Sequence, residues 1–472
     1  MAKFPNHICG FLNVNEEEFA FNVSGQLVTL LPVQTDLNQK NRSVLQLVRN
    51  YNDLPQYFIG TDDNLFKTAI FRDLNLETNH YYRSYPSFHF ATPLIIRAAG
   101  NASGLFDKMS EPWNKYHVIN FTGGNINSLY EPAVSIEQPT WEEITTSAGR
   151  RDIKFRPWEE FTKSIDCEIH GEKCTFTITV TQKDDGADSE KMWAYNLGER
   201  NACIRLEFEN PQDFDTFPKY FNIIQKLISI LTRQNNVTCN AYLCQKNPDD
   251  KLLYPTAVCY IFDKYEDFSK RRSDRVIPIE NILQYIPDMI NRIEDDFYAP
   301  LMALLPETNK DAKRISITNI QDLCTALEVA YGWHHEKREK DQLIDELKTD
   351  LKKTIQEFSK KHQDELDIYS QTNISSSFEY LNYTLREKIQ TLYKENQETI
   401  DEIIYKRGLP NLTFDEISKF VKLRNNKTHS GIIDWGNAAQ VYEPLLGLAY
   451  TCYFRETGIS DDGINLMIHN LF

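Results

Sequence analysis

Two residues near the end of one expected helix, Arg424 and His429, have the types and spacing best suited to chemistry. The guanidinium of an arginine offers forked donors that match the oxygens of a phosphate group. An imidazole, with an ordinary pKa of about 6.5, can accept or donate a proton near neutral pH. Together, facing a shared groove, the two side chains could bind a scissile phosphate.

The two side chains do not simply share one face of a helix. Five residues correspond to a rotation of about 140° on an ideal helix. They would converge if the helix loosens near Ser430 and Gly431, or if two copies of the chain meet across a two-fold axis. A dimer is therefore one way to complete such a site.

Arg424 falls on the same helical face as Ile417, Phe420 and Val421. A permanent cation on an apolar face needs an anion, because an uncompensated buried charge costs several kcal/mol. The nearest candidate by pattern is Glu328, on the inward side of an earlier expected helix. We therefore expect Arg424 to contact Glu328.

The C-terminal third, residues 311–472, has the pattern of a small helical bundle. Thr413 and Glu416 fit a capping box, which predicts a helix from Phe414 to near Gly431. Other expected helices start near Thr318 and continue through the charge-rich residues 336–365, run from about 376 to 406, and cover 437–456. The mixed charges of 336–365 favour a solvated helix face.

The N-terminal region alternates short β-prone runs with Gly, Pro and Asn, and residues 217–231 have the apolar spacing of one amphipathic helix. In residues 174–181, Phe176, Ile178 and Val180 alternate with threonines, which predicts a half-buried strand. We expect a multidomain α+β protein, with segments at 1–150 and 151–310 that form either one domain or two. The expected strands are residues 26–33, 66–71, 116–122, 174–181, 203–208 and 257–262.

Composition limits the class of protein. The chain has 472 residues, 41% of them hydrophobic, and a formal charge of −16. No apolar run approaches the roughly 20 residues of a membrane span, and no secretory signal is evident, so we expect a cytoplasmic protein. The negative charge opposes general adhesion to nucleic acid, so any RNA contact must be local.

Arg424-Asn-Asn-Lys-Thr-His429, followed by Ser-Gly, resembles the Arg-x4-His signature of HEPN-domain ribonucleases. The likeness extends to Ala-Leu-Glu328 and to the closing pattern Leu445-Leu-Gly-Leu-Ala-Tyr with Glu456-Thr-Gly-Ile459. With a β-rich N-terminal half and the segment Leu206-Glu-Phe-Glu-Asn-Pro, the chain is similar to ApeA-type anti-phage proteins. The resemblance implies a β-rich N-terminal region followed by an all-α, HEPN-like bundle.

What the resemblance further implies is a metal-independent endoribonuclease effector of abortive infection that needs no cofactor. It would cleave RNA, with tRNA as one candidate substrate, to 2′,3′-cyclic phosphate and 5′-hydroxyl ends, as a homodimer joined through the HEPN domain. The N-terminal region would sense a trigger, for which a phage protein is one candidate. The implied site residues are Arg424, His429, Asn425 and Glu328 for catalysis and Lys422 and Lys427 for RNA binding.

Two other interpretations remain open. The helical half could only dimerise while the β-rich half binds a protein partner. Alternatively, zinc could stabilise a nucleic-acid-binding protein, although no Cys-x2-Cys pair occurs and His170-Gly171 also fits a hairpin turn. The pair His334-His335 is expected to be exposed among Glu and Lys. The candidate zinc ligands are Cys167, His170, Cys174, Cys239 and Cys244.

Overall fold

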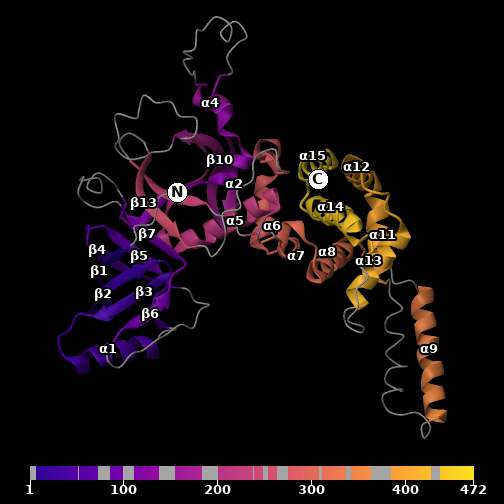
Figure 1. Cartoon of the computed structure of the whole chain (residues 1–472), viewed down its shortest axis with the longest axis horizontal. Coiled ribbons are helices and arrows are strands. Elements are labelled where there is room, and N and C mark those ends of the chain that lie inside the picture. The colour runs from indigo at the N-terminus through magenta and orange to yellow at the C-terminus, as the bar shows by residue number, and fades with distance from the viewer. Residues whose placement is uncertain are drawn as a thin grey trace, which may run out of the picture. The chain divides into compact units, whose positions relative to one another are not determined.

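The chain divides into two compact units, Met1–Asp295 and Asp296–Phe472 (Figure 1). The first unit is β-rich and the second is helical, as the sequence predicts. The boundary between the two units follows Asp295, whereas the sequence predicted that the helical part begins near residue 310. The computed structural model describes residues 7–50, 53–72, 86–98, 111–137, 155–182, 200–235, 237, 239–247, 253–262, 275–307, 311–335, 342–362, 384–426 and 436–472.

The described strands of the first unit form one 13-stranded sheet, in which every pair of neighbouring strands is antiparallel. Their order is β6-β3-β2-β1-β4-β5-β7-β13-β12-β8-β11-β10-β9. The strands are β1 (Ile8–Val14), β2 (Glu17–Ser24), β3 (Leu27–Pro32), β4 (Tyr57–Asp62), β5 (Lys67–Phe71), β6 (Phe88–Ala91), β7 (Leu94–Ala98), β8 (Lys115–Thr122), β9 (Lys163–Ile169), β10 (Glu172–Gln182), β11 (Arg200–Asp213), β12 (Asn240–Lys246) and β13 (Leu253–Ile261).

The six expected strands are confirmed as β3, β5, β8, β10, β11 and β13, and the expected amphipathic helix is α5 (Phe217–Thr232). The register between β7 and β13 joins the early strands to the late ones. One sheet therefore runs through both N-terminal segments that the sequence distinguished. Shorter helices of this unit are α1 (Leu37–Arg49), α2 (Gly124–Leu129), α4 (Trp158–Phe161) and α6 (Ile286–Glu294).

The prediction that β10 is half-buried was wrong. Phe176, Ile178 and Val180 are buried as expected, but Thr177 and Thr179 on the other face are buried too. The hydroxyl of Thr177 lies 2.9 Å from that of Ser164, and the hydroxyl of Thr179 lies 2.8 Å from that of Thr162. Because these hydrogen bonds satisfy the polar groups, the threonine face can be covered without a large penalty.

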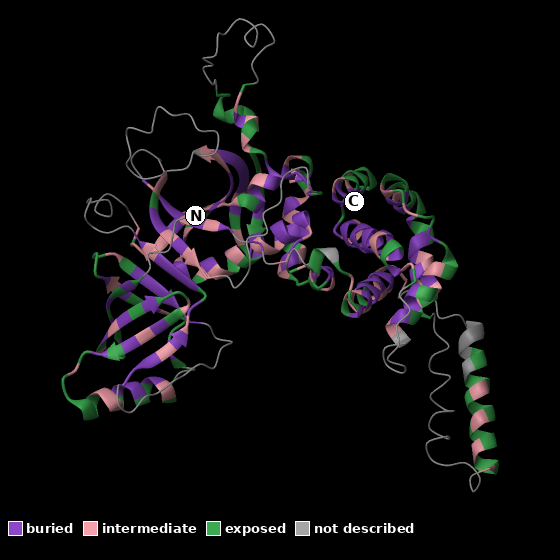
Figure 2. Ribbon diagram, in the orientation of Figure 1, coloured by how far each residue is buried: buried purple, intermediate pink, exposed green. Residues whose placement is uncertain are grey.

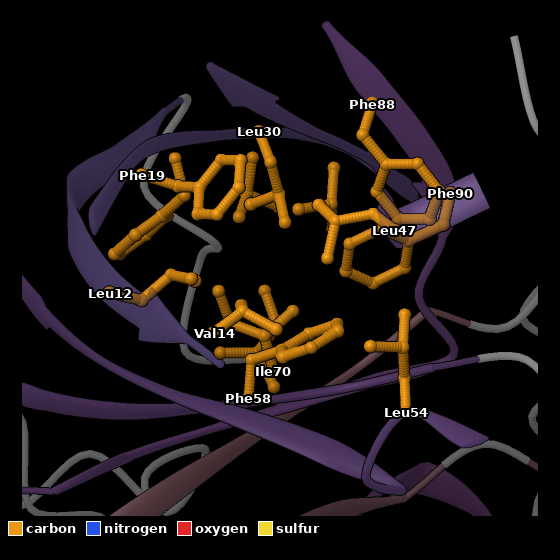
Figure 3. Packing of buried hydrophobic residues seen from close by; sticks show 14 of the residues in the cluster. Leu12, Val14, Phe19, Leu30, Leu47, Leu54, Phe58, Ile70, Phe88 and Phe90 are labelled. Atoms are coloured by element: carbon orange, nitrogen blue, oxygen red, sulfur yellow. The ribbon is translucent and has the colours of Figure 1, made fainter. Parts of the chain in front are cut away.

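One apolar core of the first unit lies between strands β1 to β7 and helix α1. Alternate residues of β1 point into it, as the strand's buried and exposed positions show. Figure 3 shows Leu47 of α1 and the rings of Phe58 and Phe90 converging on the same cluster. The centroids of these two rings lie 5.4 Å apart, within the range of favourable aromatic pairs.

The second unit is a set of helices built around α8 (Ile317–His335), which contacts α7, α11, α13 and α14. Leu323, Leu327 and Tyr331 on its inward face are buried. The side chain of Glu328, expected on the same inward side, is instead 39% exposed. The other helices described are α7 (Ala299–Met302), α9 (Gln342–Lys361), α11 (Leu385–Glu395), α12 (Gln397–Arg407), α13 (Phe414–Asn426), α14 (Ala438–Glu456) and α15 (Asp461–Leu471).

Several helix boundaries differ from those expected. The stretch expected over 376–406 is divided at Asn396 into α11 and α12. The final residues also form a helix, α15, which is capped where the hydroxyl of Ser460 accepts from the backbone of Gly463. The expected end of α13 near Gly431 lies outside the described residues. Within those described ranges, no helix combines the length and the apolar character needed to cross a membrane.

The start of α13 is confirmed together with its capping box. The backbone NH of Thr413 donates to the Glu416 carboxylate at 2.8 Å, and the NH of Glu416 donates to the Thr413 hydroxyl at 3.3 Å. Two backbone donors of the first turn are thereby satisfied. Helix α13 therefore begins at a position fixed by its own sequence.

Replacing Thr413 with alanine should lower the free energy of unfolding by about 1 kcal/mol, because it leaves an end donor of α13 without its acceptor. Denaturant unfolding followed by circular dichroism would measure this loss. Thr354→Ala is the matched control, since Thr354 is an exposed threonine in the interior of α9. Equal stability of the two variants would contradict a capping role for Thr413.

Candidate functional site

Arg424 lies in the last described turn of α13, above an apolar stripe on the same helix. Ile417, Phe420 and Val421 of that stripe are buried. Helix α13 packs against both α8 and α11, so these residues anchor the end of α13 within the bundle. The Arg424 side chain itself is half-buried and still reaches solvent.

Glu328 of α8 lies between two cations. Its Oε2 is 3.9 Å from Nη1 of Arg424, so the expected contact is present at the long limit for an ion pair. Its Oε1 is 2.8 Å from Nζ of Lys388, which is a full hydrogen-bonded ion pair. Two positive charges thus flank one carboxylate, and the three groups together carry a net positive charge.

Lys388 was not predicted from the sequence. A capping box fixes the start of α11, because the hydroxyl of Thr384 accepts from the NH of Glu387 while the backbone NH of Thr384 donates to the Glu387 carboxylate. The hydrogen bonds that the Glu387 carboxylate accepts from the backbone NH and the hydroxyl of Thr384 lower the pKa of this carboxyl. Lys388 follows directly, and its Nζ lies 5.8 Å from the ring centroid of Tyr331. The only sequence signal was a lysine one turn into a capped helix.

His335, expected to be exposed, is instead nearly covered, with a side chain only 5% exposed. Its ring stacks on that of Tyr331 at a centroid separation of 4.1 Å. Its Nε2 lies 3.0 Å from the Glu395 carboxylate and its Nδ1 lies 3.1 Å from the carbonyl of Tyr331. The expectation was wrong because α11 packs along α8 and covers the histidine. The side chain of His334 lies outside the described residues.

Cys324 lies one turn before Glu328 and is fully buried. Burial raises the pKa of its thiol to about 12, while the charge of Arg424 acts in the opposite direction and that of Glu328 reinforces the rise. The thiol is therefore neutral near pH 7 and a poor nucleophile. Any chemistry at this cluster would therefore involve its charged side chains rather than the Cys324 thiol.

The structure brings together only some of the predicted site residues. Lys422 is exposed on α13, and Asn425 lies in its last turn, although the Asn425 side chain is outside the described residues. His429 and Lys427 also lie outside them. Arg424 and Glu328 are thus the predicted residues whose contact is observed, and Lys388 joins them.

No family model, curated protein or solved structure matches this chain. Arg424 and Lys388 both reach solvent, and a shared carboxylate holds them close together. Such a pair can bind a phosphate group, since both residues favour phosphate oxygens and the guanidinium can do so with two donors.

The candidate zinc ligands do not form one cluster. Cys167 and Cys174 face each other across β9 and β10 with sulfurs 3.3 Å apart, and His170 lies in the hairpin turn between these strands. Cys244 instead accepts a hydrogen bond from Asn120, and burial raises the pKa of its thiol to about 11. Within the part of the chain that the structure describes, no three His, Cys, Asp or Glu side chains are grouped as metal ligands.

Proposed function

We propose that the helical unit is a metal-independent endoribonuclease of the HEPN type and that the chain is an effector of anti-phage defence. The observation that carries this proposal is the cluster of Arg424, Glu328 and Lys388. Arg424 is the first residue of the Arg-x4-His motif, and the cluster gives it the partner and the exposure that phosphate binding requires. The overall acidic charge fits local rather than general contact with RNA.

In the proposed reaction, the ribose 2′ oxygen attacks the adjacent phosphorus and the bond from phosphorus to the 5′ oxygen breaks. His429 takes the proton of the 2′-hydroxyl or supplies the proton that the 5′ oxygen gains. Arg424 stabilises the negative charge that develops on the phosphoryl oxygens, with Lys388 beside it. The products are a 2′,3′-cyclic phosphate and a 5′-hydroxyl.

The remaining roles follow the same proposal. Asn425 orients the phosphate or His429, Glu328 holds the two cations, and Lys422 and Lys427 contact the RNA backbone. A homodimer through the helical unit would set two copies of the motif on one groove. The β-rich unit would control the nuclease by binding a trigger, and tRNA is one candidate substrate.

The direct test is to map RNA ends in cells that express the wild-type chain or His429→Ala during phage challenge. Purified chain incubated with total RNA and a chelator provides the biochemical counterpart. New 5′-hydroxyl ends that require His429 and persist with chelator are the expected result. Their absence under both conditions, in cells that are nevertheless protected, would refute the nuclease.

A second candidate function is an interaction protein whose β-rich unit binds a protein partner. The outer face of the sheet favours it, because Phe11, Leu31 and Ile59 are large, apolar and exposed there. The strand registers place Leu31 opposite Ala20, and Ala20 opposite Phe11, in one row across the sheet. Apolar surface gathered in this way often marks a binding site for another protein.

Phe11→Glu should abolish phage protection if this face binds the partner, while leaving the fold intact because the side chain is already exposed. Plaque assays would measure protection, and thermal unfolding would confirm the fold. Tyr405→Glu, an equally drastic change at an exposed position of the helical unit, is the control. If the protein is only an interaction module, Arg424→Ala and His429→Ala should leave protection unchanged.

A further inference from the structure

Helix α9 (Gln342–Lys361) is long, and none of its described side chains is buried. Leu347 and Phe358 are 52% and 51% exposed, and every other described side chain of α9 is exposed or only partly covered (Figure 2). A helix in a protein owes most of its stability to packing one face against another element rather than to its own backbone hydrogen bonds. The exposed residues therefore suggest a surface that another helix covers.

The described apolar side chains of α9 form one narrow stripe. Leu347, Leu351, Ile355 and Phe358 follow one another at spacings of four, four and three residues. At about 100° per residue they fall within a sector of roughly 80°. Spacings of three and four residues are those of the seam between two packed helices. The ring of His362 extends the stripe by one turn, 4.5 Å from that of Phe358.

Charge is distributed unevenly along the same helix. The half from Gln342 to Leu351 has three carboxylates and one lysine, a net charge of −2, and the half from Lys352 to Lys361 has four lysines and one glutamate, a net charge of +3. Two copies of α9 side by side in antiparallel orientation would each place the acidic half against the basic half. Parallel copies would place like charges together.

We infer that α9 is an interaction surface whose partner is the α9 of a second copy of this chain, packed antiparallel. The stripe sets the register, with the two-fold axis beside Ile355 and Leu351 packed near the partner subunit's Phe358. In that register Asp350 lies beside the partner subunit's Lys361, at both ends of the interface. Antiparallel packing also places the opposite ends of the two helix dipoles together.

This inference does not rest on the proposed nuclease. It uses side chains of α9 alone, and none of them belongs to the cluster around Glu328. A dimer through the helical bundle would be a separate interface, and the two would combine into a larger assembly. Disrupting α9 should therefore halve the mass of whichever assembly the wild-type chain forms.

The test measures the mass of the full chain in solution by light scattering coupled to size exclusion. Leu351→Asp should halve the mass at micromolar concentration. It should leave the fold of both units intact, because no described α9 side chain is buried. Lys353→Asp, a charge reversal on the opposite face of the same helix, is the matched control and should leave the mass unchanged. An unchanged mass for Leu351→Asp, or a monomeric wild-type chain, would overturn the inference.

A charge swap tests the orientation. Asp350→Lys and Lys361→Asp should each weaken association roughly tenfold, because each turns two attractive pairs into repulsive ones. An equimolar mixture of these two variants should recover the wild-type mass, since every contact then joins a lysine to an aspartate. A mixture that stays dissociated would rule out the antiparallel register.

Discussion

Arg424→Ala should lower the rate of RNA cleavage by about 10²–10³-fold, the usual effect of losing one preorganised donor to a developing oxyanion. The loss should appear in the rate constant of the cleavage step, because a guanidinium stabilises charge that grows only as the phosphorus is attacked. Initial rates on a labelled single-stranded RNA, with the enzyme in its active state, would measure it. Denaturant unfolding should change little, since the side chain is only half-buried.

The neighbours of Arg424 supply the controls for that result. Lys422→Ala removes an exposed cation of the same helix and should weaken RNA binding with little change in the cleavage step. Lys388→Ala should lower the rate less than Arg424→Ala, because a single ammonium cannot grip a phosphate with two donors. Equal activity of Arg424→Ala and the wild-type chain would remove Arg424 from the mechanism.

Glu328 has a supporting role that its own substitution can separate. Glu328→Gln keeps the shape of the side chain but leaves Arg424 and Lys388 without their shared carboxylate. Because the two cations then repel each other, we expect the cleavage rate to fall less than it does in Arg424→Ala. We also expect that rate to depend more strongly on salt concentration than it does in the wild-type chain. The cluster would thus be distinguished from an ordinary surface ion pair.

The parts of the site that the sequence predicted were those fixed by local pattern. The capping box at Thr413 determined where α13 begins, and apolar spacing placed Phe420 and Arg424 on one face. The contact with Glu328 followed because a cation on that face needs an anion. Each step used residues within a few turns of one helix, or a simple charge requirement.

The parts that the sequence did not predict depend on packing between distant segments. Lys388 contacts Glu328, which lies 60 residues earlier in the chain, and the sequence around either residue does not predict the contact. His335 has charged neighbours in the sequence, but its neighbours in space are Tyr331 and Glu395. Exposure was therefore inferred from the wrong set of neighbours.

The same distinction holds for the sheet. Individual strands followed from alternation and turn residues, but their order depends on pairs such as β7 with β13 and β8 with β12. Alternation along β10 also could not show that its threonines pair with Ser164 and Thr162 and become buried. Local periodicity gives the elements, whereas long-range pairing determines which of their faces are covered.

The largest effect on stability should come from Phe420→Ala, which should destabilise the helical unit by about 3–5 kcal/mol. Phe420 is 1% exposed and lies on the buried stripe of α13, so its loss opens a cavity in the bundle. Because that stripe also anchors the turn that carries Arg424, cleavage should fall together with stability. Denaturant unfolding, with the helical unit followed separately from the β-rich unit, would measure the effect.

Phe414→Ala is the matched control, the same substitution on the same helix at a side chain 42% exposed. It should cost far less stability, because little of its ring loses contact with neighbouring atoms. A comparison with Arg424→Ala then separates two causes of lost activity. Phe420→Ala should lose stability and cleavage together, whereas Arg424→Ala should lose cleavage alone. If Phe420→Ala unfolded no more easily than Phe414→Ala, the buried stripe could not be what holds Arg424 beside Glu328.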